Sequence, residues 1–237
     1  MDLVSPSNTK ESASCDFCSS ENVLVAVVCA SCGAPMSRPS DSASKSSRSF
    51  FSLFGFPEAF GVDVASLTRQ YYDLSRQLHP DRFRKDGRPG IILAAEDLMS
   101  ELNEAFETLK DSNQRREYLL KRKLSADEFK KKGQLPMELA EQWFEVQELL
   151  EEPGAAVGAT ANITANITAG TAALKSFRAD LSSAVSEIGD RIAGLEKRYD
   201  ALGESSFLVQ IHQNVLVQNV LHSLVRDVEK TAVRLLQ

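Results

Sequence analysis

The chain has 237 residues, of which 43 % are hydrophobic and 25 % charged, with 12 glycines and 8 prolines. This length suits one large or two modest domains, and the composition excludes collagen-like and wholly disordered chains. The net charge of −6 argues against general nucleic-acid binding, and the lack of a long apolar run argues against a membrane span. The first residues fit neither a signal-peptide nor a transit-peptide pattern, so we expect a cytoplasmic protein, or a mitochondrial matrix protein in a eukaryote.

All four cysteines lie near the amino end, in two Cys-x-x-Cys pairs: Cys15, Cys18, Cys29 and Cys32. A spacing of two lets both thiolates of a pair turn toward one ion, and two such pairs complete a tetrahedral site. Residues 1–36 are too few to fold without help, so we expect a structural Zn²⁺ ion in a small zinc-ribbon-like β module, with a hairpin between the pairs. A bound iron, two local disulfides and unpaired thiols are the alternatives.

Residues 37–49 are rich in serine and have no apolar anchor, so we expect a flexible linker. Beyond it, apolar residues at helical spacing mark two amphipathic helices on either side of a polar stretch, HPDRFRKDGRPG. The first helix carries Leu67, Tyr71, Leu74 and Leu78, and the second carries Ala94, Leu98, Leu102, Ala105 and Leu109. Asp63 or Ser66 would cap the first helix. Residues 50–123 therefore predict a domain built on an antiparallel helical hairpin.

The rest of the chain predicts further helices. In a connector, 124–135, Ser125 and Glu128 form a capping-box pattern, and Gly133 would close the short helix that they open. A helix begins near Pro136, and its apolar stripe, Leu139, Trp143, Val146 and Leu150, predicts its core side. A low-complexity insert, 153–173, contains an ANIT repeat, and a long helix follows from Leu174 to Gly203. With a last helix over 207–235, the region 136–237 predicts a three-helix antiparallel bundle, and the whole chain is mainly α.

On its own, the tripeptide His79-Pro80-Asp81 favours a helix end followed by an ordinary turn over a functional loop. Its context favours function, because it lies between the two helices among basic side chains: Arg69, Arg76, Arg82, Arg84, Lys85 and Arg88. Together with FFSLFGFP (50–57), LHPDRF (78–83), LNEAFETLKD (102–111) and RREYLL (115–120), the sequence resembles the J-domain co-chaperones, specifically the HscB type of iron–sulfur cluster biogenesis. The cysteine module resembles an amino-terminal zinc-binding extension that some members carry, whereas the ANIT-rich insert departs from the family.

This resemblance implies that the chain regulates the ATPase of another protein, a DnaK/HscA-class chaperone. The implied chaperone-binding residues are His79, Pro80, Asp81, Arg69, Arg76 and Arg82. Arginines on an exposed helix face can speed encounter with an acidic partner, and Pro80 limits the conformations that docking must order. We find no nucleophile–base pair and no phosphate-binding glycine loop, so we expect that the chain is no enzyme.

The helix over 137–152 is acidic, with six glutamates and no basic residue. Helical geometry puts Phe144 more than about 90° from the apolar stripe, among these carboxylates. The family resemblance implies that this face binds an IscU-like scaffold protein through Ala140, Glu141, Phe144, Glu145, Glu148 and Glu152. Ala140 and Glu141 stand where the family prefers larger apolar residues. A plain solvated face is the alternative.

Two other functions compete with that of a scaffold-carrying co-chaperone. A generic J-protein would present misfolded clients and would not need one defined acidic helix with an aromatic anchor. A zinc-ribbon regulator would bind nucleic acid through residues 1–36, but Lys10 is the single basic residue there.

Overall fold

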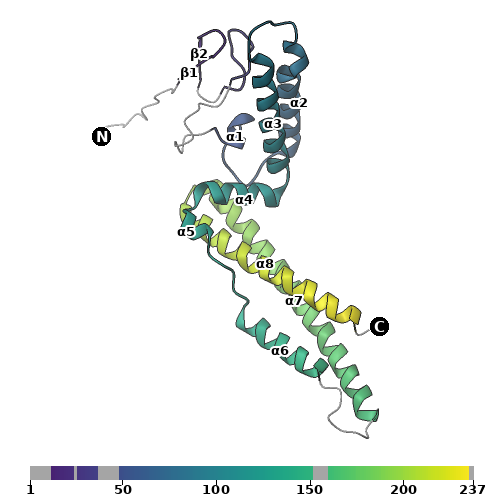
Figure 1. Ribbon diagram of the computed structural model, residues 1–237. Coiled ribbons are helices and arrows are strands. Elements are labelled where there is room, and N and C mark those ends of the chain that lie inside the picture. The colour runs from purple at the N-terminus through teal and green to yellow at the C-terminus, as the bar shows by residue number, and fades with distance from the viewer. Residues whose placement is uncertain (1–11, 24–25, 37–47, 152–159, 235–237) are drawn as a thin grey trace, which may run out of the picture. The chain divides into compact units, whose positions relative to one another are not determined.

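The computed structural model describes residues 12–23, 26–36, 48–151 and 160–234, and the fold is mainly α-helical (Figure 1). Contacts divide the chain into two compact units, Met1–Leu119 and Leu120–Gln237. None of the helices in the described ranges is both long and apolar enough to cross a membrane.

The first unit opens with two short strands, β1 (Ser12–Ser14) and β2 (Glu21–Val23), which pair antiparallel and place the first cysteine pair at their tip. An isolated bridge between Val28 and Pro35 encloses the second cysteine pair in the same way. The predicted hairpin between the two cysteine pairs is therefore wrong. Each cysteine pair instead lies at the end of its own antiparallel pairing.

Four helices complete the first unit or begin in it: α1 (Phe50–Leu53), α2 (Val64–Leu78), α3 (Ile91–Lys110) and α4 (Ser112–Lys123). The antiparallel helical hairpin predicted within residues 50–123 is confirmed, because α2 and α3 pack against each other through buried leucines: Leu67, Leu78, Leu102 and Leu109. Asp63, one of the two candidate caps, accepts hydrogen bonds from the Ala65 and Ser66 amides at the start of α2. The α4 residue Tyr118 stacks on Phe50 with 4.4 Å between ring centroids, and its hydroxyl accepts a hydrogen bond from the Phe50 amide.

The predicted linker lies mostly outside the described residues, but its last two residues are buried. Arg48 donates hydrogen bonds to the carbonyl oxygens of Met36 and Ala26, and Ser49 caps α1. These two residues therefore belong to the folded unit, since they tie the cysteine module to the start of the helical domain.

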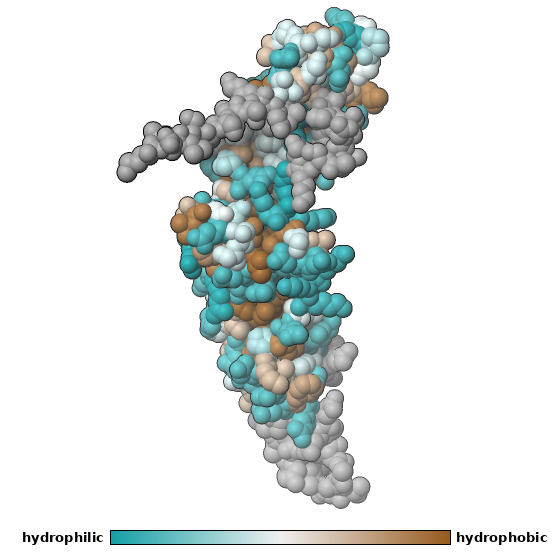
Figure 2. All heavy atoms as spheres, turned by 90° about the vertical axis from the view of Figure 1, so that its left-hand side faces the viewer, coloured by the Kyte–Doolittle hydropathy of each residue, from teal (hydrophilic) through white to brown (hydrophobic). Residues whose placement is uncertain are grey.

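The second unit contains α5 (Ala126–Phe129), α6 (Met137–Glu151), α7 (Thr160–Leu202) and α8 (Ser205–Arg234). Both α6 and α8 pack along α7 (Figure 1), and their shared core includes Val146, Phe177, Leu181, Leu221 and Val228. On the face drawn in Figure 2, apolar surface is interspersed with hydrophilic surface over these helices.

Two expectations about helix ends are corrected. The long helix begins at Thr160, so the repeat-containing residues 160–173 are helical, although 152–159 lie outside the described residues. Its predicted end is confirmed, because Gly203 follows it with a φ of +70°.

The Ser125–Glu128 capping box is also confirmed, but the helix that it opens ends at Phe129. Gly133 does not close that helix; it lies against Leu216 of α8, where an added Cβ would be 2.3 Å from the carbonyl oxygen.

Candidate functional site

The four cysteine sulfurs come together as the sequence predicts, all within 4.8 Å of one another. The Sγ atoms of Cys15 and Cys32 are 3.7 Å apart, as are those of Cys18 and Cys29. A tetrahedral zinc with Zn–S bonds of about 2.3 Å has S···S edges of about 3.8 Å. The residues present therefore fit a tetrathiolate metal site. Local disulfides do not describe it, because all four thiols are unbonded and each of the two 3.7 Å sulfur contacts joins one cysteine pair to the other.

The two cysteine pairs are held by the same backbone pattern. The Cys15 amide donates to the Ser20 carbonyl, and the Ser19 amide donates back to the Cys15 carbonyl. In the second pair, the Cys29 and Ala34 backbones bond in the same way and the Gly33 amide donates to the Cys29 carbonyl. The residue after each pair has positive φ, +56° at Ser19 and +69° at Gly33. Each turn thus directs both of its thiols toward one centre.

Local hydrogen bonds favour the thiolate form on part of this set. The Cys32 backbone amide, helped by the Asn22 side chain, lowers the pKa of Cys29 to about 6. Bonding to Ser20 also lowers the pKa of Cys18, whereas burial raises the pKa of Cys15 to about 11. Asn22 is a supporting residue that the sequence analysis missed. It is buried, its amide donates to the Cys29 sulfur at 3.4 Å, and its oxygen accepts from the Ala30 amide.

The His79-Pro80-Asp81 loop forms the end of α2 and the start of a 3₁₀ turn, η1 (Pro80–Phe83). The His79 and Asp81 side chains are 58 % and 59 % exposed, so both are open to a partner. His79 Nδ1 accepts from the Asp81 amide at 3.3 Å, and Asp81 pairs with Arg84 at 2.8 Å. Phe83, in contrast, is buried and anchors the loop to the domain.

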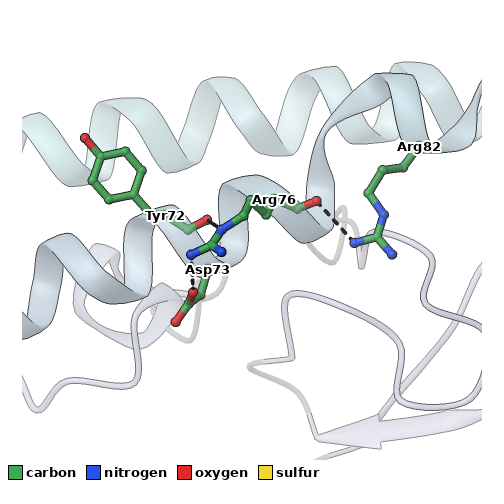
Figure 3. A network of polar contacts seen from close by, with 4 residues as sticks. All are labelled: Tyr72, Asp73, Arg76 and Arg82. Atoms are coloured by element: carbon green, nitrogen blue, oxygen red, sulfur yellow. Dashed lines mark hydrogen bonds and ion pairs between the residues drawn. The ribbon is translucent and has the colours of Figure 1, made fainter.

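The basic residues beside this loop are exposed, but acidic and backbone groups hold several of them in place. Figure 3 shows Arg76 bonded to the Tyr72 carbonyl and ion-paired with Asp73 at 2.8 Å, while Arg82 donates to the Arg76 carbonyl at 3.1 Å. Arg69 donates to the Ser66 hydroxyl. The pairing of Arg76 with Asp73 was not predicted from the sequence. The arrangement fixes two guanidinium groups along the end of α2 that leads into the loop.

The acidic helix α6 places its residues on two faces. Trp143 stacks on Phe177 of α7 and Val146 is buried, as predicted for the core side, whereas the Leu150 side chain lies outside the described residues. Phe144 is 68 % exposed. Of the other predicted scaffold-binding residues, Glu141, Glu145 and Glu148 are exposed, Ala140 is half-buried and Glu152 lies outside the described residues.

Two features of this face were missed. Met137 is 73 % exposed, and seven residues of helix bring it within about 20° of Phe144. The i, i+7 spacing was a signal that could have found it. Glu145 and Val146 also line a shallow hollow of about 250 Å³ together with Ser176, Phe177 and Asp180 of α7.

Comparison with known proteins defines the first helical domain. Residues 50–118 match the DnaJ domain family, so this part of the chain is a J-domain. Relatives that share it include HscB co-chaperones: the HscB homologue of Shewanella baltica strain OS195 is 40 % identical over 68 residues, and that of Shewanella oneidensis strain MR-1 is 37 % identical over the same length. These matches take in 29 % of this chain and 38 % of the length of those relatives.

The fold of the whole chain has a counterpart as well. The crystal structure of human co-chaperone protein HscB superimposes with a TM-score of 0.55 and 19 % identity, over 94 % of this chain and all of that one. In J-domain sequence and in fold, the chain is therefore similar to HscB co-chaperones.

Proposed function

We propose that this protein is a non-enzymatic co-chaperone of iron–sulfur cluster assembly. It stimulates the ATPase of a DnaK/HscA-class chaperone and delivers an IscU-like scaffold protein to it. The observation that carries the proposal is the His-Pro-Asp loop, which lies between α2 and α3 of a J-domain with His79 and Asp81 open to solvent.

Each residue of the loop has a distinct part in docking. His79 and Asp81 offer a hydrogen-bonding imidazole and a carboxylate, and Pro80 restricts the backbone between them so that docking orders little. Phe83 fixes the loop to the domain from the buried side. Arg69, Arg76 and Arg82 give the neighbouring surface a positive potential, which raises the rate of encounter with an acidic partner. The chemistry of ATP hydrolysis belongs to the chaperone.

The four cysteines would hold a structural Zn²⁺ ion, whose thiolates leave no open position for a substrate. This ion supplies folding energy to the amino-terminal module when bound.

The exposed face of α6 that carries Phe144 supports the scaffold protein as the cargo that is delivered. Phe144 and Met137 are exposed apolar side chains at one helical azimuth, and Glu141 and Glu148 flank them. An apolar centre with an acidic rim suits one partner surface of complementary charge. A generic J-protein for misfolded clients is the second candidate, and the scaffold binding of Phe144 variants separates the two.

The first experiment is single-turnover ATP hydrolysis by the chaperone, with full-length variants of this protein. His79→Gln and Asp81→Asn should abolish stimulation and leave helicity and melting unchanged, because both side chains are exposed. His222→Gln is a matched control, since this exposed histidine lies on α8 outside the J-domain. Full stimulation by either loop variant would contradict the proposal.

A further inference from the structure

The cysteine module and the segment after the His-Pro-Asp loop share one core. Cys15, Cys29, Ala34 and Met36 are buried together with three J-domain residues: Phe83, Ile91 and Ala95. Phe83 ends η1, and Ile91 begins α3, so both ends of the connecting loop belong to the same core cluster as Cys15 and Cys29. Between them, Gly87 and Gly90 have φ values of +72° and +76°, which leaves the loop few intrinsic constraints of its own.

Arg88 links this loop to the cysteine module. Its side chain is 28 % exposed and pairs with Asp86, which is 21 % exposed, with 2.6 Å between Nη2 and Oδ2. Its guanidinium lies 5.6 Å from the ring centroid of Phe17, the residue just before Cys18. A guanidinium group keeps its charge at every relevant pH.

A cation near the four cysteines offsets the negative charge of the metal site. Four thiolates around a divalent ion leave two net negative charges, which a nearby guanidinium offsets in a partly desolvated setting. Among the basic residues around the loop, Arg84 differs from Arg88 in that it pairs with Asp81 and is 75 % exposed.

We propose that Arg88 is a positioning residue that couples metal binding to the order of the loop following His-Pro-Asp. When the metal is bound, the cysteine module holds Phe83, Arg88 and Ile91 in place, and the loop in turn stabilises the bound metal. Because linkage is reciprocal, the factor by which metal binding favours the ordered loop equals the factor by which the ordered loop tightens metal binding. The metal thus has a role at the chaperone-facing end of the J-domain besides folding its own module.

Two measurements on full-length protein test this coupling without any partner. The first is Zn²⁺ affinity by competition with a chromophoric chelator. Arg88→Gln should weaken Zn²⁺ binding tenfold or more, the usual effect of losing a group that supports metal ligands. Arg84→Gln removes the same charge four residues away and should leave the affinity unchanged. Arg88→Lys keeps the charge without the planar fork, so its affinity should lie between those of wild type and Arg88→Gln.

The second measurement is residue-resolved hydrogen exchange. The Asp86 amide donates to the Phe83 carbonyl and the Ile91 amide to the Arg88 carbonyl, so these two protons report on the loop. Both should exchange faster after chelation of the metal, and faster in Arg88→Gln at partial Zn²⁺ saturation. The Co²⁺-loaded spectrum of Arg88→Gln should still show a tetrathiolate site, which separates weaker binding from a misfolded module.

Wild-type Zn²⁺ affinity in Arg88→Gln would overturn the coupling, and so would exchange at Asp86 and Ile91 that does not depend on metal. A consequence for the ATPase, lower stimulation by metal-depleted protein, rests on the proposed function. If that stimulation is absent in all forms while affinity and exchange behave as expected, the proposed function fails and the coupling stands.

Discussion

The Trp143 ring stacks on the Phe177 ring, with 5.6 Å between centroids and 18° between planes, while the next residue, Phe144, is 68 % exposed. Two adjacent aromatic residues, about 100° apart around α6, thus lie on different faces of the helix. One joins α6 to α7, and the other is open to a partner.

This pair gives the sharpest test of the scaffold face. Phe144→Ala should weaken binding to the scaffold protein by roughly thirtyfold, about 2 kcal/mol, because it truncates an exposed aromatic anchor. Its melting temperature should stay near that of wild type. Trp143→Ala should instead destabilise the second unit by roughly 3–5 kcal/mol, because it empties a packed position. Titration calorimetry and thermal melts on both variants measure this, and a Phe144→Ala protein that melts low but binds normally would show that the faces are reversed.

The basic surface beside the loop should act through long-range charge. Arg82→Ala should slow association with the DnaK-class chaperone at low salt, and the difference from wild type should shrink as salt screens the attraction. Asp73→Asn should instead speed association at low salt, because it removes the carboxylate that pairs with Arg76. Lys197→Ala, an exposed charge on α7, is the control. Stopped-flow association at several ionic strengths decides this, and salt-independent effects at Arg82 would count against steering.

The close approach of Gly133 to α8 predicts a matched pair of glycine substitutions. Gly133→Ala should destabilise the second unit by about 1–3 kcal/mol, because the new methyl group meets the Leu216 carbonyl at 2.3 Å and backbone must shift. Gly194→Ala should stabilise by about 0.5–1 kcal/mol, because this α7 glycine has open space around it and alanine favours the helix. Urea denaturation of both variants provides the measurement, and equal effects of the two would refute the close approach.

The cap of α2 predicts a dependence on pH. Bonding to the Ser66 hydroxyl, the Ala65 amide and nearby groups lowers the pKa of Asp63 in the folded protein. A lowered folded pKa contributes stability above the ordinary carboxyl pKa, and this contribution is lost as pH falls through the lowered value. Asp63→Asn, which keeps the shape without the charge, should melt below wild type at neutral pH. The gap in melting temperature should close in acid; a gap that is constant with pH would show that the effect does not depend on the charge of Asp63.

The sequence predicted the elements whose signals are local. The α2–α3 hairpin, the Asp63 cap, the Ser125–Glu128 capping box and the Gly203 end all depend on residues within a few positions of one another. The spacing of the cysteines likewise predicted that their sulfurs converge, because each pair closes a short turn.

What the sequence did not predict depends on residues far apart in the chain. Nothing near Gly133 reveals that it meets Leu216, more than eighty positions later, and its resemblance to a helix-ending glycine was misleading. Arg48 looked like part of a polar linker because its two carbonyl partners, at Ala26 and Met36, belong to the cysteine module. Small residues in 160–173 lowered the expectation of helix, whereas α7 continues through them. Arg88 was counted only as one of a group of cations, since its neighbour Phe17 lies in the cysteine module, about seventy positions earlier in the chain.

The core shared by Cys15, Cys29, Met36, Phe83, Ile91 and Ala95 also governs how the chain can be shortened. A fragment that starts at residue 50 would keep every helix of the J-domain, yet it would leave Phe83, Ile91 and Ala95 without their cover. Newly uncovered apolar patches promote self-association, so such a fragment should be less soluble than the intact protein. The usable amino-terminal limit of this J-domain for recombinant work therefore lies before the first cysteine, some thirty-five residues upstream of its first helix.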